Sequence, residues 1–276
     1  MDLQVTTEDS INPPAENPPE NFGAQGDNAN SPVKERVSLL KVGIDIVAQD
    51  RLTELVYELL AAGGGQNIVL LSLSDLLRAR RKGEYRTYVQ NAALVLPISK
   101  SLIGGIRFLT GKKAVRYMPF DFVVNLLTIL ETREFSLYLL GGQRRILQKT
   151  EKNIRQTFPR LRIVGRFIGA FKRQEEAGIL EAIRKASPSL LLVGKGIRGE
   201  EQWIARHTGQ LSNGLRLWCS DLYDVFAERR HRPSRKTFDR GMEWIGYAFQ
   251  NPLRFFRIFP WFGYKILLLW YKLFVK

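Results

Sequence analysis

The sequence predicts an α/β fold, in which a mostly parallel sheet carries helices on both faces. Apolar runs of strand length alternate with stretches of helical periodicity along most of the chain, a pattern typical of parallel βαβ units. Two of these runs, at residues 139–142 and 191–196, end in glycines and lead into helices. Strand ends of this kind line the ligand crevice of an open α/β sheet, and the N–H groups of a helix start attract phosphates. We therefore expect a nucleotide or nucleotide-sugar site at these turns.

The expected elements follow in chain order. Residues 37–47 alternate as a strand or hairpin, and Asp50 caps a helical pattern that stops at the glycines of residues 63–65. Further strands are expected at residues 68–73, 93–97, 135–140, 161–164, 190–193 and 215–218. Helices between them are expected at residues 74–82, 120–131, 144–157, 174–186 and 200–207. The result is a doubly wound, Rossmann-like domain.

Composition divides the chain into three pieces. Residues 1–33 contain six acidic side chains, no Lys or Arg and few apolar side chains, so we expect a disordered acidic tail. Residues 34–228 carry the alternating pattern and form the expected core. Residues 229–276 contain eleven Lys and Arg against two acidic residues and form a basic, aromatic appendage, which includes a helix expected around residues 241–250.

The end of this appendage, residues 254–276, mixes apolar and aromatic side chains with Lys and Arg. The apolar stretch is interrupted at Pro260, Gly263, Lys265 and Lys272, so it falls short of the roughly 20 residues that a membrane span needs. Basic and aromatic side chains in one segment favour a helix that lies on an anionic membrane surface. The alternative is that this helix packs on the core or contacts a second copy of the chain in a homo-oligomer.

The remaining residue types exclude several classes of function. The chain has two histidines, His207 and His231, and one cysteine, Cys219, too few for a metal-ligand pattern, so neither a metal nor another cofactor is expected. The nucleophile elbow of a Ser-His-Asp hydrolase is missing. The net charge of +15 and the basic run at residues 78–82 raise the question of nucleic-acid binding. No helix-turn-helix, zinc-ligand spacing or aromatic RNA-binding strand accompanies them, so nucleic acid is not an expected partner.

Two linked stretches carry a resemblance to a known family. The first joins residues 139–142 to residues 158–171, and the second covers residues 182–196. Further matching residues are Glu201, Trp203, Glu243, Trp244, Pro252, Arg254 and Arg257. In the order and spacing of these elements, residues 37–257 resemble the WecG/TagA/CpsF glycosyltransferase family.

The resemblance implies an inverting transferase that moves an N-acetylmannosamine-type sugar from a UDP donor to a lipid-diphosphate-linked acceptor. Such enzymes build cell-surface polysaccharides, work without a metal, and dock on the membrane through a C-terminal appendage that supplies arginines to the active site. For this chain, the resemblance implies a cytoplasmic protein held peripherally on the inner face of the plasma membrane. The absence of an apolar leader segment before the core agrees with that location.

The resemblance also assigns substrate-binding residues, each with a purely structural alternative. The turn at Gly141 and Gly142 would offer backbone N–H groups to the donor diphosphate, or else is a tight turn without a ligand. Arg254 and Arg257 would neutralise the leaving UDP or the acceptor pyrophosphate, or else contact lipid headgroups. The full expected set is Ser72, Ser74, Arg116, Asp121, Gly141, Gly142, Gly196, Glu200, Glu201, Arg254 and Arg257. Within it, the alternatives are a surface cation for Arg116, a helix cap for Asp121 and a favourable helix-dipole contact for Glu201.

The chain departs from the family pattern where the chemistry is expected. Ile98 stands in place of the aspartate that serves as the family's general base, and isoleucine cannot accept a proton. Ser72 and Ser74 stand in place of a Thr-x-Asn motif, and Glu200 in place of a glutamine, which puts a second negative charge beside an anionic donor. A positioned base typically contributes 10²–10⁴-fold to such a reaction, so the loss of the aspartate is a substantial departure.

Two explanations of this departure remain open. The chain is either a divergent transferase that uses another base, with Asp75, Asp121 and Asp221 as unranked candidates and Ser72 as a further candidate catalytic group, or a pseudoenzyme. The pseudoenzyme would bind a nucleotide-sugar or serve as a scaffold for an active homologue at the membrane. We favour the divergent transferase.

Overall fold

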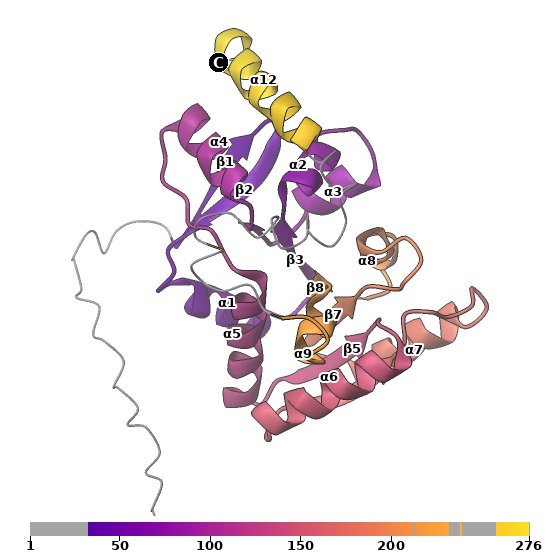
Figure 1. Cartoon of the computed structure of the whole chain (residues 1–276). Helices are drawn as coiled ribbons and strands as arrows, with labels where there is room; N and C mark the ends of the chain where they lie inside the picture. The colour runs from indigo at the N-terminus through magenta and orange to yellow at the C-terminus, as the bar shows by residue number, and fades with distance from the viewer. Residues whose placement is uncertain (1–32, 212, 232–237, 239–257, 276) are drawn as a thin grey trace, which may run out of the picture. The chain divides into compact units, whose positions relative to one another are not determined.

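The computed structural model describes residues 33–211, 213–231, 238 and 258–275, all within one compact unit, Val33–Lys276 (Figure 1). Its strands are β1 (Lys34–Leu39), β2 (Val42–Val47), β3 (Gln66–Leu71), β4 (Leu94–Pro97), β5 (Ser136–Leu140), β6 (Arg162–Phe167), β7 (Leu190–Gly194) and β8 (Leu215–Ser220). Its helices are α1 (Leu52–Ala61), α2 (Leu73–Ala79), α3 (Glu84–Gln90), α4 (Lys100–Thr110), α5 (Pro119–Thr132), α6 (Arg144–Thr157), α7 (Glu176–Ala186), α8 (Glu201–His207), α9 (Leu222–Phe226) and α12 (Ile258–Phe274).

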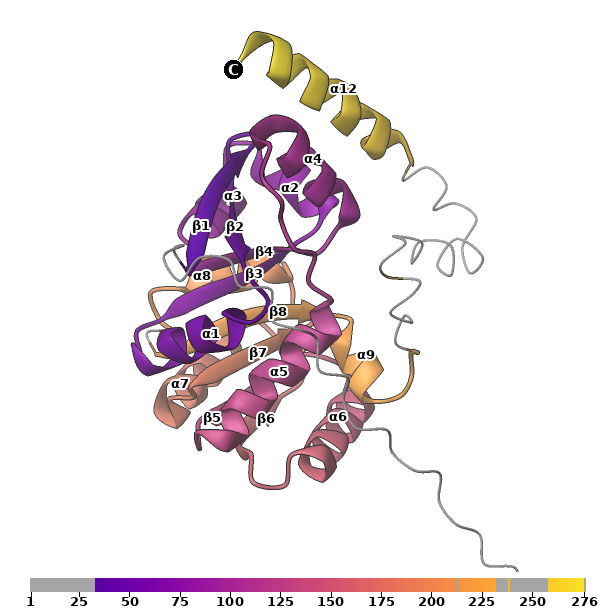
Figure 2. The ribbon, with the colours of Figure 1, turned by 90° about the vertical axis from the view of Figure 1, so that its left-hand side faces the viewer.

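Strands β3 to β8 form one sheet in the order β4-β3-β8-β7-β5-β6, and every neighbouring pair runs parallel. Helices α1, α5, α6 and α9 pack on one face, and α2, α3, α4, α7, α8 and α12 contribute to the core on the other (Figure 2). The inner strands are continuous apolar runs because both of their faces are covered. The expected α/β fold, a parallel sheet between two layers of helices, is confirmed.

A separate antiparallel hairpin, β1 with β2, docks beside β4. Asp45 is completely buried, and both of its carboxylate oxygens lie 2.7 Å from the guanidinium nitrogens of Arg36. The Asp45 carboxylate also accepts the backbone N–H of Val95 over 2.7 Å, and Arg36 donates to the Ala92 carbonyl over 2.8 Å. A bidentate ion pair therefore joins β1 to β2, and the hydrogen bonds of its two side chains to Val95 and Ala92 hold the hairpin against the sheet.

The boundaries of several elements differ from the sequence-based expectation. Helix α1 begins at Leu52 with Arg51 at its N-cap, so the expectation that Asp50 caps this helix is wrong. The helices α3, α4 and α9 were not expected. In α4 the adjacent Gly104 and Gly105 weaken the helical signal, because glycine is a poor helix former, yet the helix continues through both.

Helix α12 runs through Pro260 and Gly263, two of the residues that interrupt the apolar stretch of the sequence. Pro260 falls in the first turn, where a missing N–H costs nothing. Tyr264 and Leu268 are buried against α4 and α2, so this helix does pack on the core, while its other side stays exposed. Among the described helices, none is both long and apolar enough to cross a bilayer. The helix expected around residues 241–250 lies outside the described residues.

Candidate functional site

The carboxyl ends of the parallel strands bring chemically useful residues to one edge of the sheet. Ser72 follows β3, Ile98 follows β4, Gly141 follows β5, Lys195 follows β7 and Asp221 follows β8. The ends of β3 and β4 are tied together, because the Ile98 N–H donates to the Leu71 carbonyl over 3.0 Å. The chain moves outward from β3 to β4 on one side and from β5 to β6 on the other, which is the arrangement that opens a ligand crevice at this edge.

A cavity of about 310 Å³ opens at the carboxyl ends of β4 and β8. Its polar and charged lining comprises Ser99, Arg116, Ser220, Asp221, Arg230 and His231. Ile98 forms part of its apolar wall, together with Met118 and Phe238. The structure thus places Ile98 inside a cavity and beside charged groups, where a carboxylate could have contacted a ligand.

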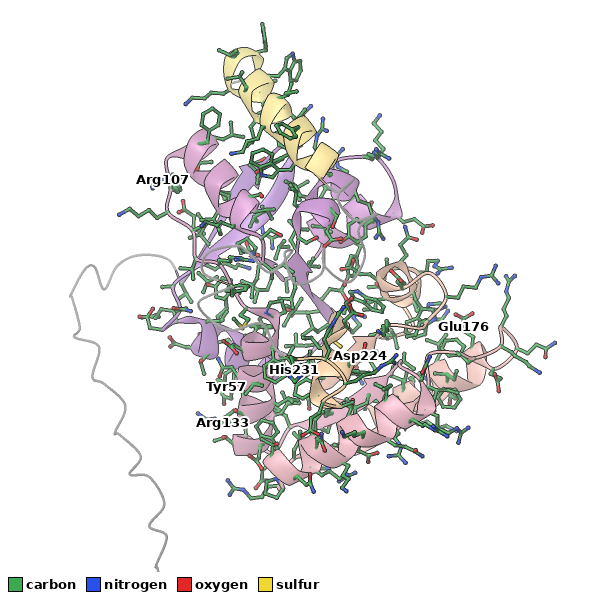
Figure 3. All side chains as sticks on the ribbon, viewed as in Figure 1. Tyr57, Arg107, Arg133, Glu176, Asp224 and His231 are labelled. Carbon is green, nitrogen blue, oxygen red and sulfur yellow. The ribbon has the colours of Figure 1, made fainter. Side chains whose placement is uncertain are left out.

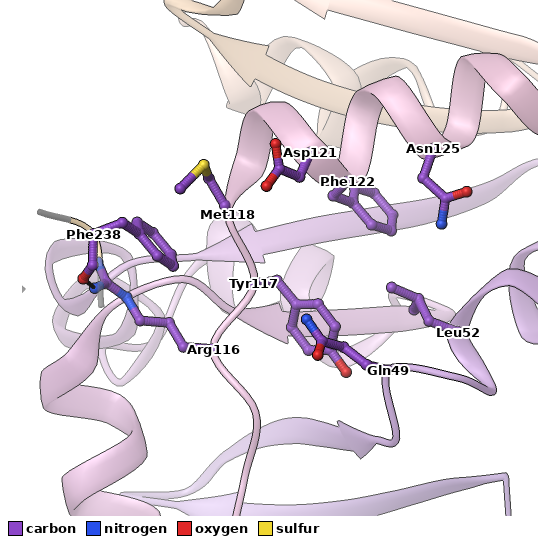
Figure 4. A pocket seen from close by; sticks show the side chains of 9 residues that line it. All are labelled: Gln49, Leu52, Arg116, Tyr117, Met118, Asp121, Phe122, Asn125 and Phe238. Atoms are coloured by element: carbon purple, nitrogen blue, oxygen red, sulfur yellow. Dashed lines mark hydrogen bonds between the residues drawn. The ribbon is translucent and has the colours of Figure 1, made fainter. Parts of the chain in front are cut away.

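A second cavity, of about 420 Å³, lies between α1 and the start of α5 (Figure 4). Its lining residues are Gln49, Leu52, Arg116, Tyr117, Met118, Asp121, Phe122, Asn125 and Phe238. Arg116, Met118 and Phe238 line both cavities, so the two adjoin. The structure therefore brings together two of the expected site residues, Arg116 and Asp121, in the wall of this second cavity.

Arg116 is held at the boundary between the two cavities. Its Nε donates to the Ile98 carbonyl oxygen over 2.8 Å, and its Nη1 donates to the Phe238 carbonyl oxygen. Its guanidinium carbon lies 3.7 Å from the centroid of the Phe238 ring, a cation–π contact. These contacts fix the orientation of a cationic fork that suits a diphosphate.

The backbone N–H groups of the glycine turn after β5 already donate hydrogen bonds within the protein. The Gly141 N–H donates to the Phe167 carbonyl over 2.9 Å, and the Gly142 N–H donates to the Lys195 carbonyl over 2.6 Å. A Cβ at Gly141 would collide with the backbone of Gly194, so this glycine serves close packing of strand ends. A diphosphate at this turn would need donors other than these two N–H groups, which corrects that part of the expectation. The exposed Gly196 belongs to the same turn region.

Asp221 belongs to a network of charges at the ends of β7 and β8. Its two oxygens lie 3.0 Å from the Lys195 Nζ and 2.8 Å from the Arg230 Nη1. Burial alone would raise the pKa of Asp221, but the hydrogen bonds and charges of Lys195 and Arg230 outweigh burial and hold the pKa below its ordinary value. Lys195 also pairs with Asp224, a buried residue of α9. A carboxylate stabilised by two cations is a poor proton acceptor, which weakens Asp221 as the missing base.

Ser72 and Asp75 form a capping box at the start of α2. The Ser72 N–H donates to the Asp75 carboxylate over 3.1 Å, and the Ser72 hydroxyl lies 2.5 Å from the same oxygen. The Ser74 hydroxyl lies 2.8 Å from that of Ser72, so the structure brings the two expected serines together. Since these groups close the helix start, Asp75 is committed to a local role. None of the three lines either cavity.

Glu201 and Glu200 begin α8, away from both cavities. Glu201 is 6% exposed. Burial first, and then the negative charge of Asp75, raises the pKa of Glu201 to about 8, against smaller opposing effects of the Tyr85 hydroxyl and Arg78. The structure thus sets Glu201 in a polar pocket among α2, α3 and α8 rather than among the cavity residues.

Arg254 and Arg257 lie outside the described residues. Arg230 and Phe238 were not predicted as cavity residues from the sequence, and His231 was considered only as a possible metal ligand. The available signal was that Ser220 ends a strand of the parallel sheet and Asp221 directly follows it. Within the part of the chain that the structure describes, no three His, Cys, Asp or Glu side chains are grouped to hold a metal ion.

The sequence is similar to known proteins. A curated N-acetylglucosaminyldiphosphoundecaprenol N-acetyl-beta-D-mannosaminyltransferase of Bacillus spizizenii is 19% identical over 180 residues, which span 65% of this chain and 69% of that relative. Residues 37–276 match the glycosyl transferase WecG/TagA/CpsF family as a whole. Because that match covers most of the sequence, the chain belongs to the WecG/TagA/CpsF family of glycosyltransferases.

Proposed function

We propose that this chain transfers an N-acetylmannosamine-type sugar from a UDP donor to a lipid-diphosphate-linked acceptor in cell-surface polysaccharide synthesis. Family membership and the activity named for the Bacillus relative support this reaction. The observation that carries the proposal is the pair of adjoining cavities with Arg116 fixed between them. They lie at the sheet edge where open α/β folds bind nucleotides.

In this proposal the donor diphosphate lies against Arg116 and Arg230. Both guanidinium groups line the cavity at the end of β4 and β8, and forked N–H donors match the oxygens of a diphosphate. Asp121, in the first turn of α5, would accept hydrogen bonds from the sugar or ribose hydroxyls in the adjoining cavity. The remaining members of the expected set, including Gly196, Glu200 and the two tail arginines, keep their roles as hypotheses.

We propose that the chain works as a peripheral protein on the inner face of the plasma membrane, docked through α12. The side of this helix that faces away from α4 carries Phe262, Ile266, Leu269 and Leu273, all more than half exposed. Their spacing places them along one stripe of the helix. Lys265 and Lys272 on the same helix supply charge for anionic headgroups, each worth roughly 1 kcal/mol near such a surface. Together with residues 229–257, this helix makes up the proposed appendage to a core of residues 34–228.

A second candidate function rests on Ile98. An aliphatic side chain lines the cavity at the end of β4, and a chain without any proton acceptor there would bind the donor but turn it over slowly. Such a protein would be a nucleotide-sugar-binding or membrane-scaffold homologue. Donor binding is common to both functions, and only turnover separates them.

Calorimetric titration with UDP tests the shared donor site. We expect binding by the wild-type chain and at least tenfold weaker binding by Arg116→Ala, with no change in Arg107→Ala, whose side chain is exposed on α4 outside both cavities. A thermal shift with UDP gives an independent check, because a ligand of the folded state alone raises Tm. Absence of binding by the wild-type chain at millimolar UDP would contradict both functions.

A further inference from the structure

We propose that His231 is the proton acceptor for the attacking hydroxyl group of the acceptor. This inference rests on the proposed transferase function and goes further by assigning a general base. It starts from the chemistry of the step, in which the hydroxyl must lose a proton as it forms a bond to carbon. A base is needed in the cavity that holds the reacting groups, and Ile98 in its wall cannot serve.

Five titratable or charged groups line the cavity at the ends of β4 and β8, namely Arg116, Cys219, Asp221, Arg230 and His231. Cys219 is buried, and burial raises the pKa of its thiol, so it is a poor candidate for a base at neutral pH. The two arginines stay protonated and cannot act as bases. Asp221 accepts from both Lys195 and Arg230 at 3.0 and 2.8 Å, so protonating it would break two ion pairs. His231 is the remaining group, and histidine is the side chain that most often serves as a general base in enzymes.

The two residues before His231 are anchored to α9 and to the turn after β8, and His231 itself is exposed at the cavity. The backbone N–H groups of Arg229 and Arg230 both donate to the Asp224 carbonyl oxygen, over 2.9 and 3.1 Å. The Arg230 side chain is anchored on Asp221. Figure 3 labels Asp224, which belongs to α9, and His231, which follows that helix in the chain. These contacts limit the positions that the next residue can take, and His231 lines the cavity at the strand ends.

The charges around His231 suit a base. Asp221, from the turn after β8, faces the same cavity and would stabilise the imidazolium that forms. The positive charges of Arg230 and Arg116 disfavour a positively charged imidazolium, and a bound diphosphate would neutralise them. The donor would therefore favour proton uptake by His231 at the moment when the acceptor hydroxyl is in position.

In the transfer step, the acceptor oxygen forms a bond to the anomeric carbon of the sugar, and the bond between that carbon and the UDP oxygen breaks. UDP leaves with the bonding electron pair, beside Arg116 and Arg230. The hydroxyl proton passes to the His231 imidazole and afterwards to water, so no oxidant, reductant or metal is needed.

The chain contains only two histidines, which makes nuclear magnetic resonance of the imidazole groups a direct first test. The matched control is His207, on α8, which hydrogen-bonds the Trp203 carbonyl at 2.8 Å and lines neither cavity. Addition of UDP should shift the His231 imidazole resonances and leave those of His207 in place, with His231→Gln and His207→Gln used for assignment. Shifts at neither histidine, in a chain that calorimetry shows to bind UDP, would overturn the assignment of His231 while leaving the donor site intact.

The second test is transfer from UDP-N-acetylmannosamine to N-acetylglucosaminyldiphosphoundecaprenol over pH 5–9. His231→Gln should lower kcat by 10²–10⁴-fold, abolish the rise of the rate through neutral pH and leave UDP affinity within about twofold. Imidazole added to His231→Ala should restore part of kcat, which a purely structural role would not allow. An active wild-type chain with an unchanged kcat in His231→Gln would overturn this inference alone. A wild-type chain that neither binds UDP nor transfers sugar would overturn the proposed function as well.

Discussion

Tyr264 of α12 lies directly against Gly105 of α4. The Tyr264 hydroxyl donates to the Ser101 carbonyl oxygen over 3.0 Å, and a Cβ at position 105 would collide with that hydroxyl. Tyr264 is completely buried, although the opposite side of the same helix is exposed. The attachment of α12 to the core therefore depends on the absence of one methyl group.

Gly105→Ala should detach or shift α12, because the new methyl group and the Tyr264 hydroxyl cannot occupy the same space. We expect faster proteolytic cleavage within α12 and a lower Tm. The matched control is Gly104→Ala, whose Cβ would meet nothing within 4 Å. That change should stabilise the chain by about 0.4–1 kcal/mol, because alanine restricts the unfolded state. Equal effects of the two substitutions would contradict this account of the contact.

The ion pair of Arg36 with Asp45 should contribute strongly to folding. Asp45 is buried at 0% exposure, so Arg36→Ala would leave an uncompensated carboxylate beneath the hairpin, at a cost of about 3 kcal/mol in the free energy of unfolding. Glu54→Ala, which removes the exposed pair of Arg51 with Glu54 at 3.1 Å, should cost less than about 1 kcal/mol. Urea denaturation measures both. Similar costs for the two variants would show that the hairpin is not anchored by this pair.

Glu201 should make the stability of the chain fall as pH rises. Burial, followed by the charge of Asp75, raises the pKa of Glu201 from 4.5 to about 8. Between these two values the unfolded chain has released the proton that the folded chain keeps, so the folded state loses about 1.4 kcal/mol per pH unit. Glu201→Gln should remove this loss. The Tm of the variant minus that of the wild type should therefore increase as the pH rises from 5 to 8. Glu200→Gln should show a much smaller gain, because the charge of Glu200 is the least of the effects that raise the pKa of Glu201, and equal behaviour of the two variants would contradict the prediction.

The exposed stripe of α12 should bind anionic vesicles. Ile266→Asp and Leu273→Asp each remove an aliphatic side chain that would enter the bilayer interface, a loss of about 1.5 kcal/mol or more, so each should weaken binding roughly tenfold. Val164→Asp is the control, since Val164 is an exposed apolar residue on the edge strand β6. Sedimentation with phosphatidylglycerol vesicles, compared with phosphatidylcholine, measures the effect. Unchanged sedimentation of the two α12 variants would refute docking through this helix.

The sequence was informative where local pattern determines structure. Apolar strands that end at Gly141 and Gly194 could be located because both faces of a parallel sheet are buried, and α6 was predicted at its observed bounds. Helix α4 was not predicted because Gly104 and Gly105 lower its helix propensity. Gly105 is required by contact with Tyr264, which is distant in the sequence. A pattern along one segment carries no information about such a partner.

The site was less predictable, for the same physical reason. The Gly141 and Gly142 N–H groups are taken by carbonyl oxygens of Phe167 and Lys195, which reach them only in the folded sheet. Glu201 lies near Asp75 of α2 and Tyr85 of α3 and lines neither cavity, which its position at a helix start does not predict, because a helix start fixes the backbone and not the direction of the carboxylate. The turn after α9 brings Arg230 and His231 close to the end of β4, and the local sequence does not predict the course of the chain in this turn.

The most direct measurement of the central claim is the transfer of radiolabelled N-acetylmannosamine from UDP to N-acetylglucosaminyldiphosphoundecaprenol in vesicles, with the Bacillus relative as a positive control. We expect label in the lipid product, release of one UDP per sugar transferred, and loss of both in Arg116→Ala. Label that stays entirely in the nucleotide fraction, while the wild-type chain binds UDP and the relative is active, would contradict the transferase account and support the inactive donor-binding homologue.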